Sequence, residues 1–391
     1  MAYDFDEIID RRNTESEKWC NLLNIYGRND IIPMWVADMD FKSPPEVIEV
    51  LEERVKHGVF GYPMLKDEYI EPFIKWIFKK HTWKINKNWV IMNSCVVDSL
   101  KTAVLTFSRP GDSVIIQPPV YRPFFNLVTS NGRTLLTNPL KIENGRYKID
   151  FNDLEKKLSE KRTKLLLFCS PHNPVGRVWE ENELKMLGEL CLKYDVLILS
   201  DEIHSDIIYN NNKHCPIASL SKELQDSTLS FYAPSKTFNL AGLRTSFVVI
   251  PNEKIRTEYE TVLASISSMS INVFGLLAAS AAYHYGEKWL DELIDYLKGN
   301  IDYVIEFFNH KLPKVIINPP EGTFLLWLDF RRFGSESFVK NILINEAHVG
   351  LEEGSIFGQE GEGFFRMNIG CPRKILVKAC DNIYNAFKSL I

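Results

Sequence analysis

The chain is predicted to be an α/β protein with a mostly parallel sheet flanked by helices, followed by a smaller α+β domain. Short apolar runs alternate with helical patterns through the middle of the chain, which is the rhythm of βαβ units. The last third changes to long helical patterns around a single strand-like run. The length of 391 residues exceeds one ordinary domain and suits two.

The strands of the expected large sheet are short runs that are apolar at nearly every position. A strand buried on both faces of a parallel sheet requires such a run, whereas a half-exposed strand alternates. Helical patterns over 96–107 and 181–194 separate some of these runs. The runs themselves cover 90–92, 113–117, 165–169, 196–200, 229–233 and 246–250.

Three parts are expected along the chain. Residues 1–45, rich in Trp and Asp, should form an arm that packs with the small domain or a partner subunit. Residues 46–285 should form the large domain and residues 286–391 the small domain. The last third carries helical patterns over 272–284 and 288–309, a strand over 322–329 and a terminal helix over 374–390.

Composition excludes several classes of protein. Hydrophobic residues make up 45% and charged residues 25%, as in ordinary globular chains, and the net charge of −5 argues against binding nucleic acid. No apolar run approaches the ~20 residues of a membrane span. The acidic N-terminus lacks a signal-peptide pattern, and the seven scattered cysteines include no Cys-x-x-Cys pair. A cytoplasmic location with reduced thiols is therefore expected.

Polar residues occur at the ends of five predicted strands, where ligands of open α/β sheets bind. Lys236 follows the run 229–233 and is placed to condense with an aldehyde, and Arg244, eight residues later, can hold an anion that arrives with it. Asp201 follows the run 196–200, and a buried carboxylate there needs a cationic partner.

The other three strand ends carry an amide, an aromatic ring and a helix start. Asn173 lies in a segment whose backbone two prolines restrict, and Tyr121 follows a Pro-Pro pair. The turn 94–97, which includes Cys95, Val96 and Val97, offers free N–H groups and a positive helix end to a phosphate. Taken singly, these features are also typical of a surface lysine, a core tyrosine or a simple turn.

Pyridoxal 5′-phosphate (PLP) is the one ligand that requires all five groups at once. Its aldehyde needs Lys236, and its protonated ring nitrogen needs Asp201. Its ring oxygen needs a donor such as Asn173, its flat face an aromatic such as Tyr121, and its phosphate the turn with Arg244. Lys236, Asp201 and Tyr121 are the expected catalytic residues. No metal site is expected, because Asp201-x-x-His204 lacks a third ligand at suitable spacing.

Six segments resemble a known family. The chain is similar to fold-type I PLP-dependent enzymes of the aminotransferase class I/II superfamily, and more narrowly to the MalY/PatB group of cystathionine β-lyases. The segment 34–41 (MWVADMDF) is the one most specific to the lyase group. The others are FGYP at 60–63, SPHNPVG at 170–176, SDEIHSD at 200–206, APSKTFN at 233–239 and FRMNIGCPR at 365–373.

The resemblance implies further site residues. Arg366 should bind the substrate α-carboxylate as a two-pronged donor, together with Asn173. Ala37 and Asp38 should line the entrance for the substrate, through their backbone more than through their side chains.

The resemblance also implies a shared phosphate site. Ser235 should be a further phosphate ligand, and Tyr62 should reach the phosphate of the neighbouring subunit of a homodimer. Cys95 stands where the family often has Gly, so an unusual backbone angle there would reshape the phosphate loop. Arg244 strengthens cofactor binding without distinguishing a lyase from an aminotransferase.

Three functions are compatible with these residues. A C–S β-lyase would cleave L-cystathionine or a related cysteine S-conjugate to a thiol, pyruvate and ammonia, and the segment 35–41 favours it. A class I/II aminotransferase would use the same residues. A regulatory PLP-fold binding protein is the third, and the intact Lys236, Asp201 and Arg366 argue against it.

Overall fold

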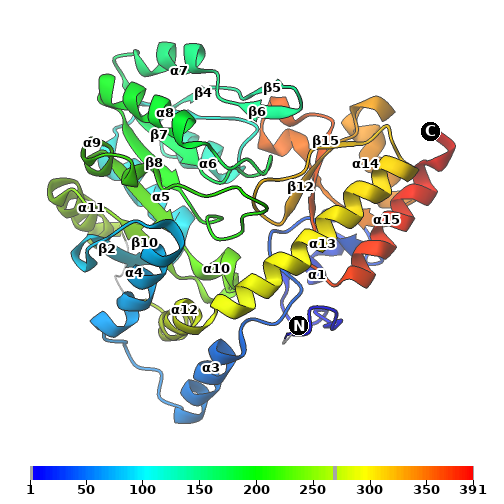
Figure 1. Cartoon of the computed structure of the whole chain (residues 1–391), viewed down its shortest axis with the longest axis horizontal. Helices are drawn as coiled ribbons and strands as arrows, with labels where there is room; N and C mark the ends of the chain where they lie inside the picture. The colour runs from blue at the N-terminus through cyan, green and yellow to red at the C-terminus, as the bar shows by residue number, and fades with distance from the viewer. Residues whose placement is uncertain (1–2, 267–270, 391) are drawn as a thin grey trace.

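A seven-stranded sheet forms the centre of the larger part of the molecule (Figure 1). The structure is a computed structural model and describes residues 3–266 and 271–390. Every neighbouring pair of strands is parallel except those that β10 makes with β2 and β9, so the predicted mostly parallel sheet is confirmed. In spatial order the strands are β2 (Val90–Asn93), β10 (Ser246–Val249), β9 (Thr228–Tyr232), β8 (Leu197–Asp201), β7 (Thr163–Cys169), β3 (Ser113–Ile116) and β4 (Thr134–Thr137).

Helices cover both faces of this sheet, which explains why its strands are apolar throughout. In β7, Leu165 and Leu167 pack in one core cluster with α5 (Val96–Phe107), whereas Leu166 and Phe168 pack in another with α8 (Glu181–Lys193). All four side chains are fully buried. The remaining helices of this part are α4 (Asp67–His81), α6 (Pro123–Thr129), α7 (Phe151–Leu158), α9 (Lys222–Asp226), α10 (Pro234–Thr237), α11 (Glu253–Ile266) and α12 (Val273–Tyr285).

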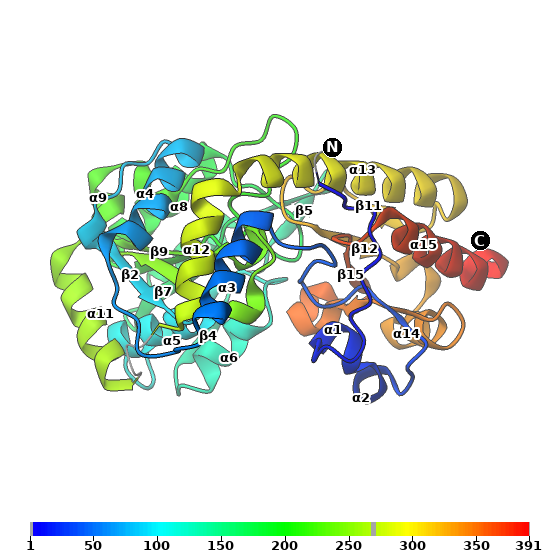
Figure 2. The same ribbon diagram turned by 90° about the horizontal axis from the view of Figure 1, so that it is seen from below.

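A second, antiparallel sheet belongs to the C-terminal part of the chain. Its order is β11 (Ile316–Ile317), β12 (Leu325–Asp329), β15 (Phe364–Asn368) and β14 (Glu352–Glu353). The long helix α13 (Glu287–Lys311) runs from beside α12 to α15, and so connects the two parts (Figure 2). The other helices here are α14 (Glu336–Asn345) and α15 (Arg373–Phe387).

The N-terminal segment packs against the C-terminal part. After α1 (Glu17–Cys20) and α2 (Leu22–Tyr26), the short strand β1 (Ile32–Pro33) pairs in parallel with β13 (Val349–Gly350). Phe5 contributes to the same core, with its ring 5.7 Å from that of Trp289 on α13. The chain then passes to α3 (Pro45–His57). The limits 45/46 and 285/286 remain a prediction.

The predicted elements lie close to the observed ones. The helix expected over 96–107 is α5, and each of the six apolar runs falls on a strand. The run 196–200 is displaced by one residue, because β8 extends to Asp201, and the strand expected from 322 begins at Leu325. The sequence did not indicate β1, β4, β11, β13, β14, β15 or the hairpin of β5 (Lys141–Glu143) and β6 (Arg146–Lys148). Among the described residues, no helix is sufficiently long and apolar to cross a bilayer.

Candidate active site

A cavity of about 370 Å³ lies at the carboxyl ends of β3, β7, β8 and β9. Residues of the N-terminal segment and of the small sheet also contribute to its wall. The cavity brings together all the predicted site residues except Asp38 and Tyr62. They are Ala37, Cys95, Val96, Val97, Tyr121, Asn173, Asp201, Ser235, Lys236, Arg244 and Arg366.

Lys236 projects from α10, the single helical turn that follows β9. Pro234 opens this turn, because its fixed φ suits the first helical position. The Lys236 Nζ donates to the main-chain oxygen of Ala37 at 2.7 Å. Burial, helped by the Arg366 cation, lowers the pKa of Lys236 to about 8. A neutral amine is therefore accessible near neutral pH, which nucleophilic or basic chemistry requires.

Asp201 is the last residue of β8, in the middle of the parallel sheet, and is 3% exposed. Its Oδ1 accepts the backbone N–H of Ile203 at 3.2 Å. Burial, together with the negative charge of Glu202, raises the pKa of Asp201 to about 7. No ion pair joins this carboxylate to a cation within the described ranges. A protonated ring nitrogen would supply the missing positive charge, so Asp201 fits the predicted PLP.

The turn before α5 can receive a phosphate. Cys95 is the N-cap and has extended backbone angles, φ −160° and ψ 163°, which any residue can adopt. The substitution of Cys for the family's usual Gly therefore imposes no strained angle. The first N–H groups of a helix have no intrahelical partner and attract anions. Val96 and Val97 offer such groups next to the cavity.

Arg244 reaches the same end of α5, but a carboxylate already holds it. Its Nη2 donates to Asp98 Oδ2 at 2.9 Å, and Ser94 Oγ donates to the same oxygen at 2.7 Å. The Arg244 and Asp98 side chains are 61% and 46% exposed. Sequence reasoning did not identify Asp98. Its position in the first turn of α5 was the available signal.

Arg366 lies on β15 and is 3% exposed. Its Nη1 donates to Asn173 Oδ1 at 3.0 Å, and its Nη2 donates to the Trp35 main-chain oxygen at 2.9 Å and to Glu352 Oε2. Its Nε is buried and has no hydrogen-bond partner among the described residues. The guanidinium is thus fixed in the cavity and retains a free donor.

Glu352, on the neighbouring strand β14, is a cavity residue that sequence reasoning missed. Burial raises its pKa, although the Arg366 cation opposes this. Its carboxylate occupies one donor of the arginine assigned to a substrate carboxylate. Only the pairing of β14 with β15, which places Glu352 opposite Arg366, reveals the contact.

Three predicted residues, Tyr121, Asp38 and Tyr62, differ in their position relative to the cavity. Burial raises the pKa of Tyr121 to about 12, so its hydroxyl stays protonated. Asp38 does not line the cavity, which corrects the expectation for this residue. Its side chain pairs with Arg11, whose Nη2 lies 2.6 Å from Asp38 Oδ2. Tyr62 is 96% exposed and lies apart from the cavity in one copy of the chain.

His172 and His204, which flank the motif segments, are both buried. His172 Nε2 lies 2.9 Å from the Pro119 main-chain oxygen, and burial lowers the pKa of His172 to about 4. His204 lines the cavity, and burial lowers its pKa strongly. Among the described residues, no group of three or more His, Cys, Asp or Glu side chains could hold a metal ion.

Comparison with known proteins identifies the family of this chain. The model of the family "Aminotransferase class I and II" matches residues 29–383, and the chain belongs to this family. Within the family it belongs to the group of PatB and MalY. It is 43% identical to cystathionine beta-lyase PatB of Bacillus subtilis over 94% of this chain and 95% of that protein. It is 32% identical to protein MalY of Escherichia coli over 99% and 100%.

A solved structure confirms the predicted fold. Cystalysin from Treponema denticola, which contains a pyridoxal 5′-phosphate cofactor, superposes with a TM-score of 0.97 at 38% identity and covers 100% of both chains. The fold of this chain is therefore that of fold-type I PLP-dependent enzymes, as the motifs predicted.

In protein freed of any cofactor, the Lys236 amine should lose its proton near pH 8 rather than near the ordinary lysine value of 10.5. Between these pH values the unfolded chain holds the additional proton, so the contribution of this group to stability increases as the pH rises. Acetylation of Lys236 at a series of pH values, followed by mass spectrometry, measures the midpoint. The peptide carrying the exposed Lys222 on α9 corrects for reagent reactivity. A midpoint near 10.5 would contradict the effect of burial.

Proposed function

We propose that this protein is a PLP-dependent C–S β-lyase that cleaves L-cystathionine or a related cysteine S-conjugate to a thiol, pyruvate and ammonia. One observation carries the proposal. Lys236, Asp201 and Arg366 meet in a single cavity whose wall includes Trp35 and Ala37, from the segment most specific to the lyase group. The 43% identity to a cystathionine beta-lyase over almost the whole chain supports the same activity.

PLP is the cofactor of this enzyme, and the cavity residues have distinct proposed roles in holding it. Lys236 would bind its aldehyde carbon, Asp201 its ring nitrogen and Asn173 its ring oxygen. Tyr121 would lie against the ring. The phosphate would bind the amides of Cys95, Val96 and Val97 together with Ser235 and Arg244.

The chemistry divides between cofactor and protein. Bound PLP supplies an electron-accepting ring that stabilises negative charge at the substrate Cα. The Lys236 amine would remove the proton from the substrate Cα, for which a pKa of about 8 is suitable. Arg366 holds the substrate carboxylate, so that the reacting bond is fixed relative to the Lys236 amine. Loss of the thiolate from Cβ then distinguishes a lyase from an aminotransferase.

We also propose a homodimer. Apolar side chains are exposed along α3 and the segment after it, which a second copy of the chain would cover. Tyr62 would then bind the phosphate in the partner's cavity. The exposed fractions are 58% for Val55, 62% for Val59, 56% for Phe60, 96% for Tyr62 and 73% for Met64. A cytoplasmic location remains part of the proposal.

Incubation with L-cystathionine should release pyruvate and a thiol at equal rates without any added keto acid. Lactate dehydrogenase coupling measures the pyruvate, and a disulfide reagent measures the thiol. Turnover that strictly requires a keto acid acceptor would instead identify an aminotransferase.

Lys236→Ala should abolish both products and the visible absorbance of the bound cofactor. A persistent absorbance band would show that the cofactor is anchored elsewhere.

Glu352→Gln should lower KM for the amino-acid substrate by about tenfold, equivalent to roughly 1.4 kcal/mol. The reason is that the substrate carboxylate would no longer compete with the Glu352 carboxylate for Arg366. Steady-state kinetics with purified enzyme measure the change. Glu353→Gln is the matched control, since Glu353 is on the same strand but pairs with Lys340. A higher KM in Glu352→Gln would mean that Glu352 holds Arg366 in place.

Val59→Glu combined with Phe60→Glu should convert a dimer to monomers and release PLP, because a charge at the proposed interface opposes association. Sedimentation velocity and cofactor absorbance measure both effects. Phe338→Glu, at a similarly exposed apolar residue on α14, should change neither.

Tyr62→Phe should leave the dimer intact and weaken PLP retention by about tenfold, in line with the loss of one charge-assisted hydrogen bond. Unchanged retention would remove Tyr62 from the phosphate site.

A further inference from the structure

We propose that a cluster of two cations and two carboxylates, Arg11, Lys18, Asp38 and Asp40, positions the main-chain carbonyl of Ala37 that receives the Lys236 amine. The four are positioning residues, since none of them lines the cavity. The inference rests on the proposed function in one respect, the role of Lys236 as the base.

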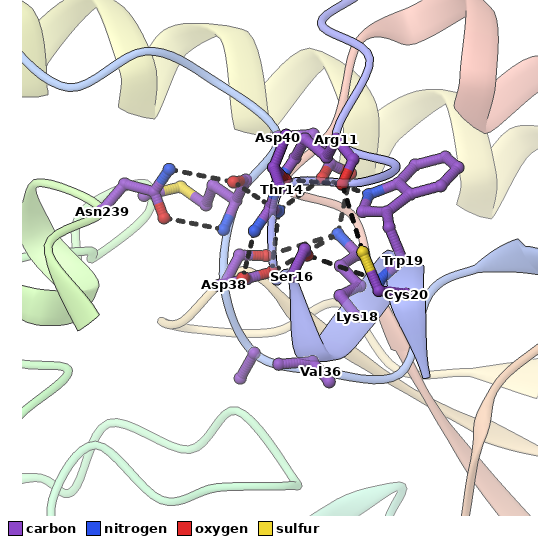
Figure 3. A network of polar contacts seen from close by, with 12 residues as sticks. Arg11, Thr14, Ser16, Lys18, Trp19, Cys20, Val36, Asp38, Asp40 and Asn239 are labelled. Carbon is purple, nitrogen blue, oxygen red and sulfur yellow. Dashed lines mark hydrogen bonds and ion pairs between the residues drawn. The ribbon is translucent and has the colours of Figure 1, made fainter. Parts of the chain in front are cut away.

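The cluster is compact and largely buried (Figure 3). Lys18 Nζ lies 2.7 Å from Asp40 Oδ2, and the two side chains are only 1% and 3% exposed. Arg11 bridges the carboxylates, with Nη1 at 2.7 Å from Asp40 Oδ1 and Nη2 at 2.6 Å from Asp38 Oδ2. Trp19 Nε1 also donates to Asp40 Oδ1, at 2.9 Å. Asp40 therefore has three donors on two oxygens.

The same cations hold the main chain of the segment 36–41. Lys18 Nζ lies 3.4 Å from the Asp38 oxygen, and Arg11 Nη1 donates to the Met39 oxygen at 3.2 Å. The N-terminal arm thus binds both the side chains and the backbone of this segment.

Two asparagines from distant elements hold the segment from its other sides. Asn239 accepts the Met39 N–H at 2.9 Å and donates to the Met39 and Phe41 oxygens at 2.9 and 2.8 Å. Asn368 Nδ2 donates to the oxygens of Val36 and Asp38, at 2.5 and 2.6 Å. The carbonyls on either side of Ala37 are thereby occupied. The Ala37 oxygen itself accepts from Lys236.

A role in stability alone explains such a cluster poorly. Burying charged groups is unfavourable even when they are paired, and apolar residues of similar size often stabilise a protein more. Buried ion pairs do fix one arrangement among several, because any other leaves a charge unpaired. Here the arrangement that they fix is the path of the backbone past Lys236.

The path of the backbone past Lys236 matters because charged groups near this amine affect its protonation. Arg366 disfavours its ammonium form, whereas Asp38, Asp201 and Glu352 favour it. Asp38 is adjacent to Ala37, and Arg11 binds both of its oxygens. The cluster thus keeps a carboxylate away from the amine while presenting a neutral carbonyl to it.

Lys18→Met should loosen the segment without touching the cavity. In cofactor-free protein, amide hydrogen exchange in a peptide spanning 36–41 should increase about tenfold, while a peptide spanning 197–201 in β8 stays unchanged. In the holoenzyme, kcat should fall by about tenfold with KM within twofold, because a misplaced base slows the chemical step more than binding. Lys18→Arg, which retains the positive charge, should show the exchange rate at 36–41 and the kcat of the unchanged protein.

Arg133→Met is the matched control. Arg133 is also a buried cation, 8% exposed, and donates to Ser108 Oγ and Ser108 O at 2.9 and 2.6 Å, away from the cavity. The Arg133→Met variant should have a lower melting temperature, whereas amide exchange at 36–41 and kcat should stay unchanged. If Lys18→Met behaves like this control, the cluster is structural only and the inference fails.

Arg11→Gln provides a second route if Lys18→Met does not fold, because the Arg11 side chain is 21% exposed and its loss leaves Lys18 paired with Asp40. It should increase exchange in the same peptide, and unchanged exchange would overturn the inference. The exchange measurement requires neither substrate nor turnover. Absence of lyase activity would therefore refute the proposed function without altering the outcome of this test.

Discussion

The site is organised around a carboxylate that has no cation of its own in the described part of the chain. Asp201 ends a central strand of a sheet covered on both faces, so water cannot stabilise its charge, and its pKa rises to about 7. Such a group is unfavourable in an empty protein and favourable beside a positively charged ligand. On the proposed assignment, the position of Asp201 would therefore determine where the ring of the cofactor lies. Lys236, Asn173 and the start of α5 surround that position.

Neither part of the molecule contains a complete site. The large sheet supplies Lys236 and Asp201, whereas Arg366 and Glu352 come from the small sheet. The N-terminal segment connects the two, because the oxygen of Trp35 accepts from Arg366 and that of Ala37 accepts from Lys236. Movement of this segment would therefore displace both Arg366, which is assigned to the substrate carboxylate, and Lys236, which is assigned to the proton.

The sequence predicted best what depends on local patterns. Runs such as 165–169 are recognisable because both faces of the strand are buried, and Asp201 and Lys236 are recognisable because they follow such runs. Glu352 and Lys18 were not recognised, because their importance arises from partners 14 and 22 residues away that no local period indicates. Two-residue strands such as β1 and β13 carry no periodic signal at all. Cys95 imposes no unusual backbone angle on the phosphate loop, because its backbone is extended.

The pairing of Arg244 with Asp98 has a consequence for cofactor exchange. A phosphate arriving at α5 meets an arginine whose charge is already balanced by a carboxylate, and both side chains are in contact with solvent. Solvent and salt weaken electrostatic attraction at such a position. On the proposed assignment, long-term retention of the cofactor then depends mainly on the helix amides and on the bond to Lys236. Lys236 would be released from the cofactor whenever it acts as the base, so an enzyme working rapidly would hold its cofactor less firmly than one at rest.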